Sequence, residues 1–364
     1  MIFIMIVGLV FVVFLWTLVY RHCWDQRIAL FVTFPVEAVF AGETAQLTEI
    51  IENRKKLPVP VMEVRLSLRQ GLRFRDEENT SVSDNVYKRD IFSLSGMQKI
   101  TRQITFTCEK RGLYEIREVQ VSAFSLMYQE QYIRMFSMHP ALYVYPKRVE
   151  VDDILSVSMH MLGEIAQKKY LHEDPFAFRG IREYTTLDAP KTINWKASAK
   201  TGALMVNTFD SGLRGKFMLY LDVEDDGIVR HENLIEESIS VAASLLGRLL
   251  SGGMEAGVAV NQKNEENSVI LPAAGAVQAV RIERMLACYN GNGDGRAFGS
   301  LLGKREEDTV YLFVSKEKER AGEIESFLGE DGMGIWIFPT GSKEDAPCAV
   351  NRKNLRLCIR EVSH

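Results

Sequence analysis

The chain has 364 residues, a net charge of −4 and five cysteines that form no CxxC pair. This length exceeds one ordinary domain, so at least two folded units are expected. The near balance of charges argues against nucleic acid as a partner, and the cysteine pattern favours neither a disulfide framework nor a zinc site.

The first segment, residues 1–20, is predicted to be a transmembrane helix. It carries no charged side chain, and at about 1.5 Å per residue it spans a hydrocarbon core of about 30 Å. A cleaved signal peptide is the main alternative, but the segment lacks a basic start and a small-residue cleavage site. Basic residues (Arg21, His22 and Arg27) occur only after the span. This asymmetry predicts a single-pass protein of the cell membrane whose C-terminal domains are cytoplasmic.

The segment 28–147 is expected to form a β-sandwich domain. Apolar and polar side chains alternate from Met62 to Arg69, as in a strand with one buried face. Further strands are predicted at 30–35, 45–51, 100–108, 115–121 and 141–145. Many short strands separated by turn residues, without a helical period, favour a sandwich.

The segment 148–213 is polar, lacks a sustained period and mixes charged with aromatic residues. We expect it to connect the two domains, partly as strand and partly as loop, and to pack on one or both of them.

This connecting segment contains the densest local signal in the chain. Its candidate motif and interface residues are Arg179, Gly180, Arg182, Tyr184, Asp188, Trp195, Lys196 and Ser198. We expect a chiefly structural role, in which Trp195 is buried and Arg182 pairs with Asp174 or Asp188 to hold the two domains in one orientation. An exposed patch for a partner protein is the alternative, and the residue types leave both open.

From residue 214 to 364 predicted strands alternate with predicted helices, which indicates an α/β domain with a mostly parallel sheet. The apolar run 217–221 is typical of a strand buried on both faces. Leucine and isoleucine recur at helical spacing over 233–250, before a pair of glycines at 252 and 253. Further strands are predicted at 258–260, 309–314 and 334–338, and further helices at 277–289 and 316–328.

An acidic stretch, 222–226, directly follows the first strand of this α/β domain. Ligands of open α/β sheets bind at the carboxyl ends of strands, so Asp222, Glu224 and Asp226 are candidate oxygen ligands for Mg²⁺. A solvated acidic loop without a metal is the alternative interpretation, and we expect any Mg²⁺ binding here to be weak.

The sequence contains no HExxH, GxSxG or P-loop pattern, and no GxGxxG that opens a helix. We therefore expect no enzymatic activity, no catalytic residue and no required cofactor. A metal-dependent enzyme that uses the Asp222 cluster is the alternative function.

Thirteen residues of the connecting segment match the signature of the DUF58 family of membrane proteins, which this chain resembles. They are Phe178, Gly180, Ile181, Arg182, Tyr184, Asp188, Ile193, Trp195, Ser198, Ala199, Lys200, Leu204 and Val206. Upstream stretches at 42–43, 57–60, 111–114 and 144–146, together with Asn53, are similar to the β domain that precedes this signature. The resemblance covers nearly the whole chain.

The resemblance implies that the C-terminal domain is von Willebrand A-like and doubly wound. A metal-ion-dependent adhesion site in such a domain begins D-x-S-x-S, and here Glu224 and Asp226 replace both serines after Asp222. The resemblance also implies an adaptor or scaffold that works with a MoxR-type AAA+ ATPase as partner, and with a transglutaminase-like membrane protein as a further candidate partner.

Overall fold

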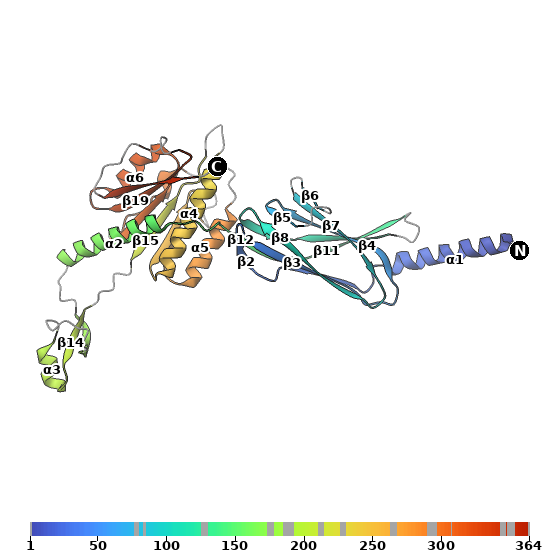
Figure 1. Ribbon diagram of the computed structural model, residues 1–364, viewed down its shortest axis with the longest axis horizontal. Helices are drawn as coiled ribbons and strands as arrows, with labels where there is room; N and C mark the ends of the chain where they lie inside the picture. Colours follow the sequence, from blue (N-terminus) through green and yellow to red (C-terminus); the bar gives the residue numbers. More distant parts are fainter. Residues whose placement is uncertain are drawn as a thin grey trace. The chain divides into compact units, whose positions relative to one another are not determined.

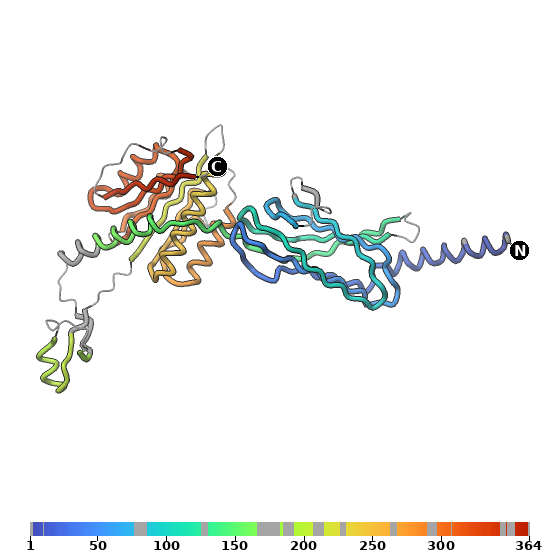
Figure 2. Tube along the Cα trace, in the orientation of Figure 1, coloured from blue at the N-terminus to red at the C-terminus, as the bar shows by residue number. Residues whose placement is uncertain are grey.

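The computed structural model describes residues 2–75, 80–82, 85–124, 130–172, 178–184, 193–209, 215–225, 231–262, 268–289, 297–306, 308–342, 347 and 354–362, with side chains at 2, 10, 80–82, 85, 166–182 and 207–209 excepted. The chain divides into two compact units. The first comprises Met1–Val149 with Glu283–Asn290, and the second comprises Glu150–Ile282 with Gly291–His364. Figure 2 traces the chain from the blue N-terminal helix to the red C-terminal strands.

Helix α1 (Ile2–Cys23) is the apolar element predicted at the start of the chain. Most of its large apolar side chains are exposed, for example those of Phe3, Leu9 and Phe11. Its length and composition are those of a membrane span, and a signal sequence would meet the same criteria.

The C-terminal end of α1 is attached to the β-rich unit by side-chain contacts. Lys55 Nζ donates to the carbonyl oxygen of Cys23 at 2.7 Å and also to that of Trp24. Tyr20 and Trp24 are buried, and each ring lies 6.1 Å from the ring of Tyr132. A cation placed on the last carbonyls of a helix satisfies acceptors that have no partner within the helix. Burial lowers the pKa of Lys55, although nearby Asp25 opposes the shift.

Among the described residues of the first unit, twelve strands form three sheets. Figure 1 shows this strand-rich unit following α1. The strands are β1 (Ile28–Thr33), β2 (Ala38–Phe40), β3 (Thr44–Asn53), β4 (Val59–Arg69), β5 (Leu72–Phe74), β6 (Thr80–Val82), β7 (Asn85–Leu94), β8 (Lys99–Cys108), β9 (Gly112–Glu115), β10 (Glu118–Phe124), β11 (Gln131–Ser137) and β12 (Ala141–Tyr145). The strand orders are β1-β3-β8-β5, β11-β10-β4-β7-β6 and β2-β12-β9.

The two larger sheets are antiparallel and share one hydrophobic core, as predicted for a β-sandwich. Along β3 the side chains of Ala45, Leu47 and Ile51 are buried while their neighbours are more exposed, which is the period of two that a one-sided strand requires. The predicted strand at 115–121 is instead divided between β9 and β10. The sequence analysis did not predict β7 or β11.

Helix α2 (Asp152–His172) contradicts the expectation of only strand and loop after residue 147. Ile154, Ser158, Met161, Leu162 and Ile165 are buried along one face, and their spacing is that of an amphipathic helix. This face packs on α4 and on the six-stranded sheet. The helical spacing of these apolar residues is present in the sequence, but the sequence analysis did not recognise it among the polar residues between them.

The second unit is built on a six-stranded sheet. Its strands are β15 (Lys216–Leu221), β16 (Glu255–Val260), β17 (Val269–Ala273), β18 (Thr309–Val314), β19 (Met333–Thr340) and β20 (Leu355–Glu361), in the order β17-β16-β15-β18-β19-β20. All neighbours are parallel except the β16–β17 pair. The sequence analysis did not predict β17 or β20.

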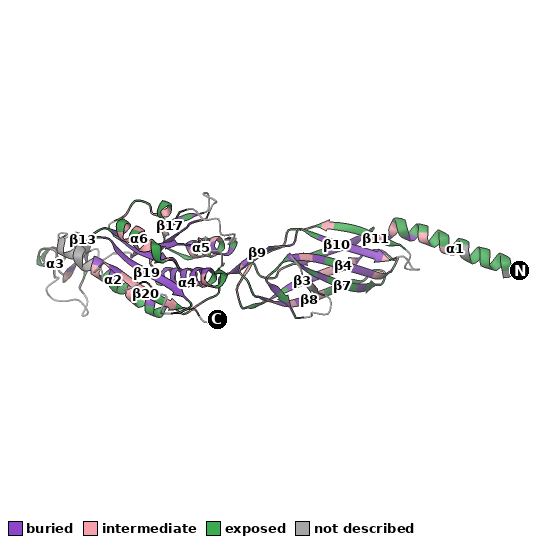
Figure 3. Ribbon diagram, turned by 90° about the horizontal axis from the view of Figure 1, so that it is seen from above, coloured by how far each residue is buried: buried purple, intermediate pink, exposed green. Residues whose placement is uncertain are grey.

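Helices cover both faces of this sheet, which explains why β18 and β19 are buried along their whole length. Figure 3 shows the buried strand β19. The helical elements are α4 (Glu232–Ser251), α5 (Ala276–Cys288), the short η4 (Phe298–Leu301) and η5 (Lys318–Arg320), and α6 (Ala321–Leu328). Residues of η4 and α6 pack with Tyr220 and Trp336 on one face, while α2 and α4 contact the sheet as well. The helix predicted at 316–328 therefore begins as η5 and continues as α6.

Candidate functional site

Three polar side chains meet where neighbouring parallel strands end. Asp222 follows β15, Asn261 follows β16 and Ser315 follows β18. We call this the carboxyl edge of the sheet. Strand β15 is the first strand of the sheet along the chain and lies between β16 and β18, so later strands are added on both sides of it. In open α/β sheets, ligands bind at the carboxyl ends of the strands where the strand order changes direction in this way.

The carboxylate of Asp222 accepts a hydrogen bond on each oxygen. Oδ1 accepts from Asn261 Nδ2 at 2.5 Å, and Oδ2 accepts from Ser315 Oγ at 2.8 Å and from Arg320 Nε at 3.1 Å. The residue is only 2% exposed. A buried carboxylate is stable only when such partners replace its hydration, so this edge is a closed polar network.

Arg320, at the end of η5, supplies the positive charge of this network. Its guanidinium also donates to Glu224, and to Glu323 Oε1 at 3.2 Å. It lies 5.7 Å from the centre of the Phe298 ring. Burial by itself would lower the pKa of Arg320, but the charges of Asp222 and Glu224 raise it above its ordinary value.

A second ion pair lies beside the first. Lys316 Nζ donates to Asp225 Oδ1 at 2.9 Å and to the carboxylate of Glu317, while the backbone N–H of His231 donates to Asp225 Oδ2 at 2.7 Å. Burial tends to raise the pKa of Asp225, but these donors outweigh it and the pKa falls below its ordinary value. The acidic stretch is therefore tied into the domain by two internal cations.

The predicted metal ligands do not form an open cation site. Asp222 and Glu224 both accept from Arg320, and Asp226 lies outside the described residues. Across the described ranges, no group of three or more His, Cys, Asp or Glu side chains is arranged to hold a metal ion. The donor set, with Arg320 in its centre, does not fit a divalent ion.

The sequence analysis missed four residues of this network: Asn261, Ser315, Lys316 and Arg320. Asn261 and Ser315 are the first polar residues after apolar strands, and the sequence alone contains that signal. Arg320 and Lys316 have no comparable signal, because their distance from Asp222 along the chain gives no indication of contact.

The signature segment forms a small module of its own. Strand β13 (Phe178–Glu183) pairs with β14 (Met205–Phe209) in antiparallel register, and helix α3 (Trp195–Thr201) lies between them in sequence. Arg179, Gly180 and Arg182 lie on β13, while Asp174 and Asp188 fall outside the described residues. The predicted pairing of Arg182 with either aspartate therefore lies outside the described residues and side chains.

Two polar residues of the signature segment hold α3 in place. Asn194 Oδ1 caps the helix by accepting from the backbone N–H of Ala197 at 2.9 Å. Ser198 Oγ donates to the Asn194 carbonyl at 2.8 Å and accepts from the backbone N–H of Met205 at 2.8 Å. Gly202 ends the helix at φ +73°, a conformation that favours glycine.

Trp195, the first residue of α3, is 69% exposed. The expectation that it is buried is wrong, because the helix cap and the β13–β14 pairing leave its side chain on the outer surface of the module. Lys196 is exposed as well, and Tyr184 is half-buried.

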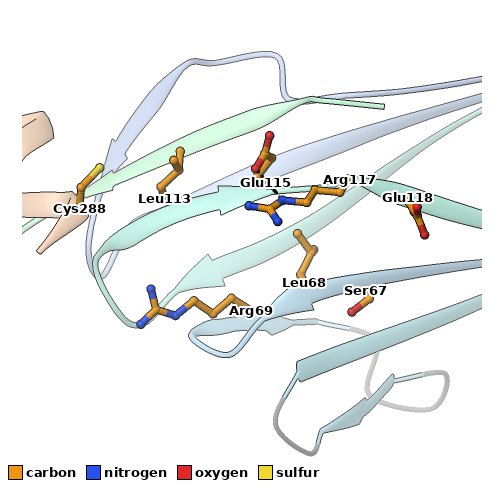
Figure 4. Close-up of a pocket in the computed structure, with 8 residues that line it drawn as sticks. All are labelled: Ser67, Leu68, Arg69, Leu113, Glu115, Arg117, Glu118 and Cys288. Atoms are coloured by element: carbon orange, nitrogen blue, oxygen red, sulfur yellow. Dashed lines mark hydrogen bonds and ion pairs between the residues drawn. The ribbon is translucent and has the colours of Figure 1, made fainter. Parts of the chain in front are cut away.

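A groove of about 740 Å³ lies in the first unit (Figure 4). Its lining residues are Ser67, Leu68, Arg69, Leu113, Glu115, Arg117, Glu118 and Cys288. Arg117 Nε and Glu115 Oε2 are paired at 3.0 Å in its wall. Partial desolvation raises the pKa of Cys288, although the residue as a whole is exposed.

These features define a mixed α/β protein with an apolar N-terminal helix and a β-sandwich unit. No family model and no curated protein matches the sequence. Similar solved structures include AvmM, which catalyses macrocyclization in alchivemycin A biosynthesis, at 11% identity and a TM-score of 0.26, over 34% of this chain and 93% of that chain.

Two other similar structures come from archaea. The CARDB domain of a Pyrococcus furiosus protein, in complex with di-metal ions, is 13% identical with a TM-score of 0.21, over 32% of this chain and 93% of that chain. A non-cellulosomal cohesin from Archaeoglobus fulgidus is 13% identical with a TM-score of 0.23, over 34% of this chain and 94% of that chain. Likenesses with such TM-scores carry no argument about function.

Proposed function

We propose that this chain is a membrane-anchored adaptor of the DUF58 type that binds a MoxR-type AAA+ ATPase in the cytoplasm and has no enzymatic activity. The observation that carries the proposal is the exposure of Trp195 on the β13–β14–α3 module. Tryptophan is the residue type most often found at the energetic centre of protein interfaces. The ATPase as partner comes from the resemblance of the signature segment.

Neighbouring residues of the signature segment support a recognition role for Trp195. Ser198 Oγ links α3 to the first residue of β14, and Asn194 and Gly202 begin and end the helix. Trp195 contributes little apolar burial to the module. Tryptophan is enriched in protein interfaces relative to the rest of the surface, so its exposed side chain supports a recognition role.

We further propose that the second unit is von Willebrand A-like. Its strand order, β17-β16-β15-β18-β19-β20, is the doubly wound order when the strands are numbered along the chain. The acidic stretch lies at the carboxyl end of the first of these strands, where the resemblance leads us to expect an adhesion-type loop.

The anchor and its orientation belong to the same proposal. Helix α1 supplies the single span, and Arg21 and His22 in its last turn favour a cytoplasmic C-terminal side. Green fluorescent protein fused after residue 364 should fluoresce, whereas alkaline phosphatase fused there should be inactive. Phosphatase activity at this position would overturn the orientation.

Partner binding can be tested with the full-length chain in detergent and a purified MoxR-type ATPase from the same organism. We expect Trp195→Ala to weaken binding by about 30-fold, the effect of losing about 2 kcal/mol at an interface hot spot. Leu271→Ala on β17 is the matched control, because Leu271 is 73% exposed but lies outside the module. It should bind like wild type.

Two results would count against the adaptor proposal. An ATPase that fails to bind the wild-type chain removes the proposed partner. If Trp195→Ala binds the ATPase with unchanged affinity, the β13–β14–α3 module is not part of the interface.

The second candidate function is a metal-dependent enzyme, and one observation favours it. Ser315 and Lys316 converge on the carboxylates of Asp222 and Asp225. Both side chains, however, are engaged in hydrogen bonds with those carboxylates. The adaptor therefore remains the better supported function.

A further inference from the structure

Arg320 lies among three carboxylates at the carboxyl edge of the six-stranded sheet. Its Nε donates to Asp222, and its two terminal nitrogens donate to Glu224 and Glu323. The side chains of Asp222 and Glu224 are 1% and 14% exposed, and that of Arg320 is 16% exposed. One guanidinium thus offsets part of the negative charge of three acids. Water reaches Asp222 and Glu224 poorly, while the Glu323 side chain is 39% exposed.

The oxygen atoms around this guanidinium are of the type that a hard divalent ion prefers. They belong to the carboxylates of Asp222, Glu224 and Glu323, and the Ser315 hydroxyl contacts the same Asp222 oxygen as Arg320. Mg²⁺, Ca²⁺ and Mn²⁺ are bound in proteins by carboxylates, hydroxyls, carbonyls and water. Among the described residues, Glu323 Oε2 is buried without a hydrogen-bond partner.

We propose that Arg320 is a resident cation that takes the place of a divalent metal ion at this edge, so that the wild-type domain is closed to metal. Removing the guanidinium converts Asp222, Glu224, Glu323 and Ser315 into a divalent-cation site. The resemblance to von Willebrand A-like domains implies a metal here, and the side chains of this chain disagree with it.

The physical reason is charge balance in a poorly hydrated site. Three carboxylates that approach one another without a cation repel and are costly to bury. The guanidinium fixes them with directed hydrogen bonds, and its planar fork matches carboxylate geometry. A metal ion would have to displace an arginine that is part of the chain and therefore present at high effective concentration. The inference does not depend on which partner the protein binds.

The test is manganese uptake by the full-length chain in detergent, followed by the loss of the electron paramagnetic resonance signal of free Mn²⁺. Wild type should take up no Mn²⁺ at this edge at micromolar concentrations. Arg320→Gln should take up about one ion per chain, and its unfolding temperature should rise with added Mn²⁺. Arg320→Gln/Asp222→Asn should lose that uptake.

Two controls separate this site from general charge effects. Arg248→Gln removes one guanidinium from the same unit, but its partner Asp152 is an exposed carboxylate, so it should take up no Mn²⁺. Arg320→Lys keeps a positive charge at the edge and should also take up none.

Three results would overturn the proposal. The first is stoichiometric Mn²⁺ uptake by wild type that Asp222→Asn abolishes. The second is a folded Arg320→Gln that takes up no Mn²⁺. If Arg320→Gln does not fold in metal-free buffer, folding with millimolar Mn²⁺ supports the proposal, and failure to fold under both conditions overturns it.

Discussion

Asn261 holds Asp222 and the residue after it with one side-chain amide. Its Nδ2 donates to Asp222 Oδ1 at 2.5 Å, and its Oδ1 accepts from the Val223 backbone N–H at 2.7 Å. Asn261 is fully buried and follows the strand next to the one that Asp222 follows. The amide thus links two neighbouring strand ends and fixes the start of the acidic stretch.

We expect Asn261→Ala to destabilise the second unit by about 2–4 kcal/mol, because it leaves a buried N–H and a buried carboxylate oxygen each short of a hydrogen bond. Urea unfolding followed by tryptophan fluorescence measures this, since Trp336 lies in the core of the same unit. A loss below about 0.5 kcal/mol, the usual range of surface substitutions, would show that the amide contributes little.

Trp195 and Trp336 form a matched pair for testing burial. Trp336 is fully buried and Trp195 is 69% exposed. Trp336→Ala should cost about 3–5 kcal/mol, whereas Trp195→Ala should change stability by less than about 0.5 kcal/mol. Thermal unfolding of both variants decides between these values. A loss of several kcal/mol for Trp195→Ala would restore the structural role that the sequence analysis first predicted.

Glu49 on β3 makes the stability of the β-sandwich depend on pH. The carboxyl group is 1% exposed, and within the described structure neither oxygen has a hydrogen-bond partner. Burial raises its pKa from 4.5 to about 7. Asp90 adds to the rise, and Arg102 and Lys88 oppose it.

The sign follows from the raised pKa. Well below pH 4.5 the carboxyl is protonated in both the folded and the unfolded chain, so Glu49 does not reduce the free energy of unfolding. Between pH 4.5 and about 7 the unfolded chain loses this proton while the folded chain keeps it. The free energy of unfolding therefore falls by about 3 kcal/mol in total as pH rises through about 7. Unfolding free energies from pH 4.5 to 8 should show this loss, and Glu49→Gln should remove it. An equal slope in both proteins would assign the effect to other groups.

Lys55 and Lys56 test how α1 is joined to the β-sandwich. Lys55 is buried and donates to two carbonyls at the end of α1, while Lys56 is exposed. Lys55→Met should destabilise the first unit by about 1–3 kcal/mol, because two carbonyl groups lose a charged donor. It should also speed proteolysis after Trp24. Lys56→Met should do neither, and equal behaviour of the two variants would contradict the capping role.

The sequence by itself determined the elements whose side-chain period is strong. The sequence predicted the apolar helix α1, the alternating strand β4 and the apolar strands β15 and β18. In each of them the order of apolar and polar residues shows which side chains are kept from water. Helix α4 was predicted from the same evidence. Short edge strands such as β17 have too few periodic residues to be recognised.

Only the tertiary structure decided the chemistry of the acidic stretch and the exposure of Trp195. Asp222 and Arg320 are 98 positions apart in the chain, and they meet because β15 and β18 pair in parallel and bring their carboxyl ends to one edge. The sequence identified the acids but not the cation that neutralises them. Likewise, the aromatic and charged composition of the signature segment fits a core or a surface equally well. The side on which Trp195 lies is set by the cap at Asn194 and by the pairing of β13 with β14.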